Sequence, residues 1–592
     1  MEPTITLAMI VRNEGENLAG CLESLQVAVD EIVIVDTGST DQTLAIAAGY
    51  TNKIYHFNWT DDFSAARNFA IGQSNGNWIL SMDADEFLDS SQGTLRDCIQ
   101  AAAAAEAIFL PLHYLRHNSD LQGYDQFLVL RLFRNLPQYR FAGSIHEQLS
   151  IPCDGKTRIA GQPVIYHQAI PLQARNRKRN RNIGLLNKAC RHEPDNYFLQ
   201  HYLGVEWLGF GKFALASTLF AAVCANLPAE QVLFRAPAVC NLILCLRQEG
   251  RLAEAYAVCN KACQQYPVYT DLFFDAGTLL AEQGQYQQAV SWLQAAVAMG
   301  KPPPEFVHTN GVESFLAYDQ LGHCYEALGE SDKAEACYRQ AFQANPAYLD
   351  CLQHLFALKL GQMEPDQLFA YFRELGCLEQ RQPAQALAAL LLAAGWPEWA
   401  AACYEALPGW DSLIIAVRSM VFCGELQQAI SMMNNVRLQQ EALPVAAEFY
   451  EILAVVLQQD YPQARRLALL MWRDPAKRST ALAFLIVLSK YAVPVRTIKP
   501  EKHREPAVVQ TLLAIVDGCL GYRRKNGAAI HPLQAVYVDV ANKTMLCLTE
   551  LSAAGNAALA EYLKRKGRTV YQALAARLKL SVTAGGGVPH DK

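Results

Sequence analysis

Short apolar runs separated by polar segments fill the N-terminal part of the chain. Three of them predict buried strands, at residues 5–11 (ITLAMIV), 31–35 (EIVIV) and 78–82 (WILSM). The segments between them have the polar spacing and the start signals of helices. Strand and helix therefore alternate as in a βαβαβ unit, which predicts a Rossmann-like α/β domain over a mostly parallel sheet.

Two capping-box patterns mark where helices are expected to begin. Asn13 is followed three residues later by Glu16, and Ser39 by Gln42. The second pattern predicts a helix over residues 41–48. No G-x-G-x-x-G turn follows the first strand and no Walker lysine is present, so the sequence does not favour a dinucleotide-binding domain or a P-loop NTPase.

Further along, the apolar pattern takes a helical period and repeats itself. Copies begin near Tyr197, Ala236, Thr270 and Phe315. The fourth copy has a regular set of small and large residues: Leu321, Gly322, Tyr325, Gly329, Ala334, Tyr338, Ala341 and Pro346. This set fits a tetratricopeptide repeat, in which small residues let two helices approach and large ones fill the groove between them. The long interval before the last copy predicts an inserted loop.

Beyond residue 346 the helical period continues while the repeat decays. Degenerate copies are centred on Gly395 and Gly424. We expect an all-α solenoid that continues with a cap over residues 347–580, followed by a flexible tail at 581–592.

Three acids follow the strand at 78–82 almost directly: Asp83, Asp85 and Glu86. At the carboxyl edge of an α/β sheet, two such carboxylates can converge on a divalent cation that bridges phosphate oxygens. A solvated turn or a helix cap would give the same pattern. Glycoside hydrolysis is not favoured, because its two acids stand about 5 to 9.5 Å apart, whereas Asp83 and Asp85 are separated only by Ala84.

Four motifs in a fixed order carry a family resemblance: VRNE at 11–14, DTGSTDQT at 36–43, WTDDFSAARN at 59–68 and SMDADEF at 81–87. They resemble the family 2 glycosyltransferases of the GT-A fold, and within them the bacterial branch whose chains continue into tetratricopeptide repeats. The resemblance covers about the first 170 residues. It implies a metal-dependent hexosyltransferase that uses a nucleotide-sugar donor, with a UDP-sugar expected, and inverts the anomeric carbon.

The resemblance also implies roles for residues of these motifs. Asp36 would hydrogen-bond the nucleotide base, although an Asp at this place could instead form a turn. Asn13 and Arg67 would lie beside the donor and its phosphates. Asp83 would lie near the ribose and the metal, and Asp85 would bind Mn²⁺ or Mg²⁺.

A second candidate site lies in the segment FAGSIHEQ, which follows a predicted strand at 127–133. The resemblance implies that Gly143 lets the backbone approach the sugar and that Glu147 takes the acceptor proton. His146 could instead do that work or orient the phosphates. His167 matches the late histidine that completes the metal site in many GT-A enzymes, and a structural role is its alternative.

Composition and charge narrow the setting of the chain. Its 592 residues are 51% hydrophobic and carry a net charge of -6, so the basic run RNRKRNR at 175–181 is read as the solvated face of a linker helix, with no nucleic-acid partner. No apolar run reaches the about 20 residues of a membrane span, and no signal peptide is expected. The 17 cysteines form no C-x-x-C pair, which favours reduced thiols in a bacterial cytoplasm.

These features predict a transferase domain at residues 1–172, a basic linker helix at 173–196 and tetratricopeptide repeats at 197–346. The expected acceptor is a Ser, Thr or Cys of a peptide or protein presented by the solenoid. A transferase for lipopolysaccharide or another cell-envelope glycan is one alternative, and a non-catalytic binding scaffold is another. The repeats could also mediate a homodimer.

Overall fold

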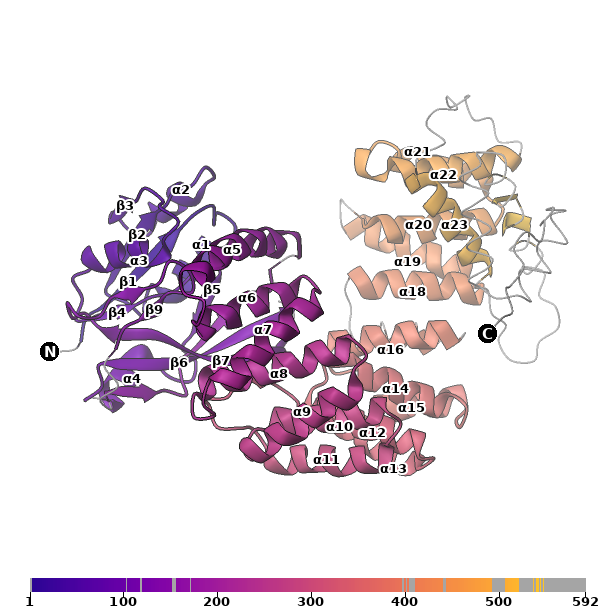
Figure 1. The fold of residues 1–592 in the computed structure, drawn as a ribbon. Helices are drawn as coiled ribbons and strands as arrows, with labels where there is room; N and C mark the ends of the chain where they lie inside the picture. Colours follow the sequence, from indigo (N-terminus) through magenta and orange to yellow (C-terminus); the bar gives the residue numbers. More distant parts are fainter. Residues whose placement is uncertain are drawn as a thin grey trace. The chain divides into compact units, whose positions relative to one another are not determined.

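The computed structural model describes residues 3–102, 104–117, 120–151, 156–170, 172–394, 396, 399–400, 402–403, 410–439, 443–491 and 506–520, with 536, 539–541, 543–544 and 547. The chain divides into two compact units, residues 1–351 and 352–592. The first unit holds a β-sheet and the helices that follow it, and the second holds helices (Figure 1). An α/β domain followed by an all-α region is thereby confirmed.

The sheet of the first unit is ten-stranded in the described part of the chain, with a main order β3-β2-β1-β4-β7-β6-β11-β5. Its strands are β1 (Ile5–Val11), β2 (Glu31–Asp36), β3 (Ile54–His56), β4 (Trp78–Leu80), β5 (Glu86–Asp89), β6 (Ala107–His117), β7 (Asp120–Arg134), β10 (Thr157–Ile159), β11 (Val164–His167) and β12 (His308–Thr309), and β8 (Phe141–Ala142) pairs with β9 (Gln148–Leu149) apart from it. The strands from β3 to β4 run parallel, whereas β7 is antiparallel to both β4 and β6. The sheet is therefore parallel over the predicted βαβαβ unit and mixed beyond it.

Helices α1 (Leu18–Leu25), α2 (Thr43–Ala47), α3 (Phe63–Gly72) and α4 (Leu95–Ala101) connect these strands. The two predicted capping boxes are wrong, since neither helix begins where they placed it. Asn13 Oδ1 accepts from the Thr40 N–H at 2.7 Å, and the Asn13 N–H donates to Ser39 Oγ at 3.0 Å. The polar side chains read as caps instead bind the loop after β1 to the loop after β2.

The repeats form helix pairs, of which three begin at the predicted starts, while the second begins at Val232 and not at Ala236. The pairs are α6 (Tyr197–Gly209) with α7 (Phe213–Asn226), α8 (Val232–Gln248) with α9 (Leu252–Gln265), α10 (Thr270–Glu282) with α11 (Tyr286–Met299), and α12 (Phe315–Ala327) with α13 (Ser331–Ala344). A Cβ on Gly322 would lie 2.5 Å from Cε1 of Tyr338, and one on Gly204 would lie 2.8 Å from Cε1 of Phe220. Only glycine lets the paired helices approach this closely. The helix α5 (Leu172–His192) links the sheet to the first pair.

The long connection between α11 and α12 adds a strand to the sheet. Its β12 pairs antiparallel with β7. Next to this pairing, Nδ1 of the buried His308 lies 2.8 Å from Asp271 Oδ2 on α10, and its Nε2 lies 3.3 Å from Glu313 Oε2. The Thr309 hydroxyl donates to Asp125 Oδ1 on β7 at 2.7 Å. The predicted inserted loop thus fastens the repeats to the sheet.

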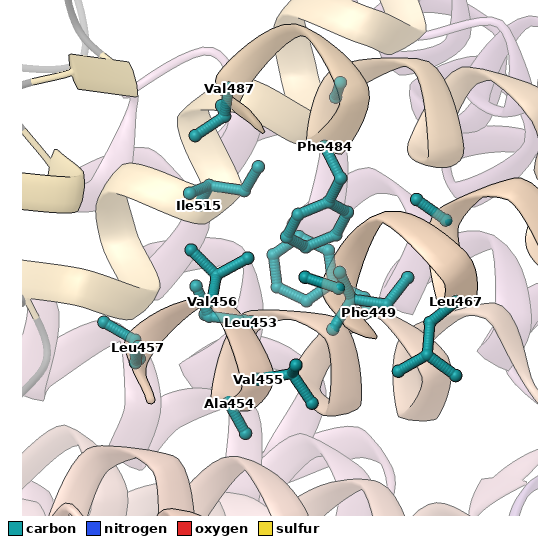
Figure 2. Packing of buried hydrophobic residues seen from close by; sticks show 14 of the residues in the cluster. Phe449, Leu453, Ala454, Val455, Val456, Leu457, Leu467, Phe484, Val487 and Ile515 are labelled. Carbon is teal, nitrogen blue, oxygen red and sulfur yellow. The ribbon is translucent and has the colours of Figure 1, made fainter. Parts of the chain in front are cut away.

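Helices continue through the second unit. They are α14 (Leu349–Leu360, which crosses the boundary), α15 (Pro365–Glu374), α16 (Arg381–Ala394), α18 (Trp410–Cys423), α19 (Leu426–Gln439), α20 (Val445–Leu457), α21 (Tyr461–Met471), α22 (Arg478–Leu488) and α23 (Pro506–Leu520). Figure 2 shows their core, where Phe449 and Leu453 of α20 pack with Phe484 of α22 and Ile515 of α23. Gly424 follows α18 with a φ of +80°. Gly395 and the predicted tail lie outside the described residues.

Candidate functional site

The loops after β1, β2 and β4 meet at one edge of the sheet, because β1 pairs in parallel with both neighbours. The carboxylate of Asp36, which is buried, accepts hydrogen bonds from the N–H groups of Gly38 and Ser39 at 3.1 and 3.0 Å. Asn13 holds the adjoining loop through its side chain. The structure therefore places Asp36 at the end of β2 and Asn13 in the loop after β1, both at this edge.

Two arginines hold the carboxylate of Asp83, of which Arg67 is buried and Arg131 is partly buried. Arg67, on α3, donates from Nη2 to Asp83 Oδ1 at 2.7 Å and from Nε to Glu147. Arg131, on β7, donates from Nη2 to Asp83 Oδ2 at 2.9 Å and to Glu86 Oε1 at 2.6 Å. We call Arg67, Asp83, Glu86, Arg131 and Glu147 the arginine cluster.

The electrostatics of this cluster keep Asp83 ionised. Burial works to raise its pKa, but the guanidinium groups of Arg67 and Arg131 hold it well below its usual range. Burial raises the pKa of Glu86, which is 1% exposed and also accepts the Asp83 N–H at 2.9 Å. Because both oxygens of Asp83 bind guanidinium groups, the structure does not bring this residue together with Asp85 on one cation.

Asp85 and His167 form a separate corner. Asp85 is 6% exposed, and its Oδ2 lies 3.6 Å from Nε2 of His167 at the end of β11. Nδ1 of His167 donates to the carbonyl oxygen of Gln168 at 2.8 Å, and in the neutral tautomer that makes this bond the lone pair is on Nε2. Nζ of Lys178, on α5, donates to the same Asp85 oxygen at 3.0 Å. We call Asp85, His167 and Lys178 the cation corner.

A carboxylate beside an imidazole is a donor set that suits Mn²⁺ and can take Mg²⁺. In the described part of the chain, no three His, Cys, Asp or Glu side chains are grouped so that they could hold a metal ion. An ion on Asp85 and His167 would need its other ligands from water or from phosphate oxygens, as Mg²⁺ commonly does. The residues present therefore fit a cation that binds together with a phosphorylated substrate.

The basic run forms the solvated face that the sequence predicted only in part, since Arg177 and Arg181 are exposed while another face contacts the site. Arg175 donates to Tyr114 Oη at 2.7 Å and lies over that ring, and Lys178 belongs to the cation corner. Residues three apart share one face of a helix, and this face of α5 contacts the site. The sequence could not distinguish a charged helix face in water from one that packs against a buried carboxylate, as Lys178 does against Asp85.

The segment that carries Glu147 is held from α3. Asn68 donates from Nδ2 to the carbonyl oxygen of Phe141 at 2.9 Å and accepts from its N–H at 2.8 Å. The chain then turns through Gly143, with a φ of +99°, and His146, with a φ of +50°. Glycine adopts this left-handed conformation without steric cost, so the turn itself requires Gly143.

His146 is packed by the first repeat. Its ring stacks on Tyr202 of α6, with centroids 3.8 Å apart and planes 13° apart. Burial lowers the pKa of His146 to about 4, so its imidazole is uncharged at physiological pH. Its Nε2 is buried and has no hydrogen-bond partner among the described residues.

A cavity of about 870 Å³ lies between the turn that carries His146 and Glu147 and the repeats. Its polar wall includes Arg67, Arg131, His146 and Glu147. Apolar side chains of β7, such as Phe127 and Val129, line it as well. The repeats contribute Tyr202, Leu233 and Phe234 from α6 and α8, with Glu305 and Val307 from the connection before β12. Helices of the solenoid thus form part of the same cavity as Glu147.

Sequence reasoning did not single out Arg131, Lys178 or Tyr202. A signal for Arg131 was present, because a charge inside the apolar strand FLVLRLF needs a buried partner. The other two lie on helices whose place beside the sheet no local spacing encodes.

Comparisons with known proteins agree with this organisation. Residues 6–156 match the family model for glycosyl transferase family 2, and residues 316–348 match a tetratricopeptide repeat model. A TPR repeat-containing protein of Synechococcus elongatus is 32% identical over 358 residues, which cover 58% of this chain and 76% of that protein.

Other relatives match shorter stretches. The glycosyltransferase SunS of Bacillus subtilis is 28% identical over 204 residues, or 33% of this chain and 47% of that protein. The lipopolysaccharide core biosynthesis glycosyltransferase LpsC of Rhizobium meliloti is 36% identical over 112 residues, or 18% of this chain and 40% of that protein. The chain therefore belongs to the family 2 glycosyltransferases whose transferase domain continues into tetratricopeptide repeats.

Proposed function

We propose that this glycosyltransferase moves a sugar from a nucleotide-sugar donor, with a UDP-sugar expected, to a Ser, Thr or Cys of a polypeptide, with the help of Mn²⁺ or Mg²⁺. The observation that carries the proposal is the shared cavity, which has Glu147 on one wall and residues of α6 and α8 on another. A small acceptor would not need a wall built from repeats, whereas an extended chain would use one.

The donor binds at the edge formed by the loops after β1, β2 and β4. Asn13 and Asp36 shape the turns that receive the nucleotide, and Asp83 positions the guanidinium groups of Arg67 and Arg131. Asp85 and His167 hold the divalent ion. When bound, this ion supplies Lewis-acid stabilisation of the diphosphate leaving group.

The acceptor meets the sugar at Glu147. As the acceptor oxygen or sulfur bonds to the anomeric carbon, its proton passes to the Glu147 carboxylate and the bond to the diphosphate breaks, which inverts the configuration. The hydrogen bond from Arg67 Nε orients this carboxylate. A positioned base of this kind contributes about 10²- to 10⁴-fold. His146, neutral and beside Glu147, is the competing base.

A cell-envelope glycan is the second candidate acceptor. The LpsC relative, named for lipopolysaccharide core biosynthesis, favours it. That match covers only 18% of the chain, so the proposal of a polypeptide rests on the wall that the repeats provide.

The test uses two exposed leucines of the repeats as a matched pair. Leu233 lines the cavity and is 39% exposed, whereas Leu215, on α7 and 52% exposed, is not among its lining residues. Donor turnover is measured with Mn²⁺ over a panel of nucleotide sugars, with and without a library of Ser-, Thr- and Cys-containing peptides. Peptide should stimulate turnover by the wild type and by Leu215→Asp, but much less by Leu233→Asp, while turnover without peptide stays equal. Equal stimulation of both variants would contradict an acceptor path along the repeats.

A further inference from the structure

Lys178 joins two acidic motifs of the donor edge from a helix outside the sheet. Its Nζ lies 3.0 Å from Asp85 Oδ2 and 4.0 Å from Glu14 Oε1. The side chain is 43% exposed. The side chain of Asp85 is only 8% exposed, so the pair joins an ammonium group that solvent can reach to a buried carboxylate.

Arg175 extends the same face of α5 one turn earlier. It donates from Nη2 to Tyr114 Oη, and the Tyr114 ring stacks on His167 with centroids 4.6 Å apart. Nε of Arg175 is buried without a hydrogen-bond partner among the described residues. A buried N–H donor of a cation that lacks an acceptor is costly, unless a ligand supplies the acceptor.

We infer that Lys178, supported by Arg175, binds the diphosphate of the donor, so that the helix leading into the repeats completes the donor site. This inference rests on the proposed function, because it assumes a nucleotide diphosphate at the donor edge. Lys178 is then a binding residue for the donor, and α5 is part of the transferase site and more than a linker.

The charges of the edge support this assignment. Glu14, Asp83 and Asp85 all lie at the edge that must receive an anionic diphosphate. Arg67 and Arg131 are already engaged by Asp83 and its neighbours. Lys178 is a compact cation on a flexible stem, and such a group can exchange a carboxylate for a phosphate oxygen. Among the cations of the site, Lys178 is therefore the one that a phosphate can most easily recruit.

The first test measures UDP binding by isothermal titration calorimetry with EDTA present. Lys178→Ala is compared with the wild type, with Lys178→Arg and with Arg177→Ala. Arg177 is exposed on the same helix, so its variant removes the same charge without touching the site. Lys178→Ala should bind UDP about fivefold to tenfold more weakly than Arg177→Ala, as expected for loss of one charge-assisted hydrogen bond. Lys178→Arg should recover part of the loss.

The second test measures Mn²⁺ binding without nucleotide by electron paramagnetic resonance. Removing Lys178 frees Asp85 from a competing cation, so Lys178→Ala should bind Mn²⁺ more tightly than the wild type, while Arg177→Ala should not. The two tests thus predict opposite signs for one substitution. Partial unfolding of Lys178→Ala would weaken the binding of both UDP and Mn²⁺, so it cannot produce opposite signs. The melting temperature of each variant shows whether it is folded.

Three outcomes are decisive. Weaker UDP binding with tighter Mn²⁺ binding in Lys178→Ala supports the inference. Equal UDP affinity of Lys178→Ala and Arg177→Ala overturns it and leaves the transferase assignment intact. If the wild type binds neither UDP nor another nucleoside diphosphate with or without Mn²⁺, the proposed donor site itself fails.

Discussion

Asp83 and Asp85 are two residues apart in the sequence, yet they belong to two sites that are built differently, the arginine cluster and the cation corner. In the cluster, guanidinium groups engage both oxygens of Asp83 and reach Glu86 and Glu147. In the corner, Asp85 is shared between a flexible lysine and an imidazole nitrogen at 3.6 Å. This difference supports the proposal that Asp83 is a fixed part of the frame, whereas Asp85 exchanges its partners for a ligand.

The largest expected effect falls on Glu147, the proposed base, whose carboxylate accepts a hydrogen bond from Arg67. Glu147→Gln keeps a hydrogen-bond acceptor for Arg67 but removes the proton acceptor, so the rate of transfer should fall about 10²- to 10⁴-fold. UDP affinity and melting temperature should stay close to those of the wild type. The measurement is single-turnover transfer with saturating donor. His146→Gln is the matched variant, and a larger loss there would move the base to the histidine.

The arginine cluster should contribute to the free energy of unfolding. Arg131→Met leaves the buried carboxylate of Glu86 without its guanidinium partner, and breaking a buried pair in this way costs about 3 to 5 kcal/mol. Chemical denaturation followed by circular dichroism measures the change. Arg251→Met, which removes a surface pair on α9, should leave the midpoint unchanged. Equal midpoints for the two variants would show that the cluster does not stabilise the fold.

The cation corner should behave in the opposite way. His167→Gln removes the imidazole that we propose as a ligand. Mn²⁺-dependent UDP binding should then weaken by at least about tenfold, which is the lower end of what loss of an outer-shell partner costs. His167 takes no part in the ion pairs of the arginine cluster, so the denaturation midpoint of His167→Gln should equal that of the wild type. If stability falls and Mn²⁺ dependence stays, His167 is a structural residue and the comparison between the two corners fails.

The smallest effect concerns a third charged group, at the strand that fastens the repeats to the sheet. Burial lowers the pKa of His308, but Asp271 and Glu313 outweigh it and raise that pKa to about 9. Because the pKa is raised on folding, the charged His308 stabilises the fold fully at a pH below the pKa of the unfolded state. This stabilisation is lost as pH rises through the pKa of the folded state. Melting temperature should therefore drop between about pH 7 and about pH 10 more in the wild type than in His308→Gln. The guanidinium groups of the arginine cluster keep their charge over this pH range, so they do not contribute to the drop. If wild type and His308→Gln lose melting temperature in parallel as pH rises, the His308 ion pairs are not its cause.

Local patterns in the sequence predicted much of the fold. The strand at Ile5–Val11 and the helix starts at Tyr197, Thr270 and Phe315 follow from runs and spacings that the structure reproduces. The pairing of Gly322 with Tyr338 follows from the same repeat logic. The capping boxes failed because Asn13 and Ser39 have neighbours across the sheet edge that no local pattern shows.

The candidate site was less accessible to sequence reasoning. Motif order brought Asp83, Asp85 and Glu147 into one site, since each follows an element of the sheet. It could not show that Asp83 is taken up by two arginines, nor that Lys178 reaches Asp85 across 93 residues of chain. Contacts of this kind depend on where α5 packs, which is a tertiary property. The same holds for β12, which joins β7 from within the repeats.

The central claim is that Asp85 binds a divalent cation in place of Lys178. The transferase site in which it does so has part of its wall formed by the repeats. Its most direct test is turnover of a nucleotide-sugar panel with Mn²⁺, by the wild type and by Asp85→Ala, with and without peptide. The account predicts Mn²⁺-dependent turnover of one donor by the wild type, stimulated by peptide, and its loss in an Asp85→Ala protein that melts like the wild type. Equal Mn²⁺-dependent turnover by both proteins, or turnover by neither, would contradict it.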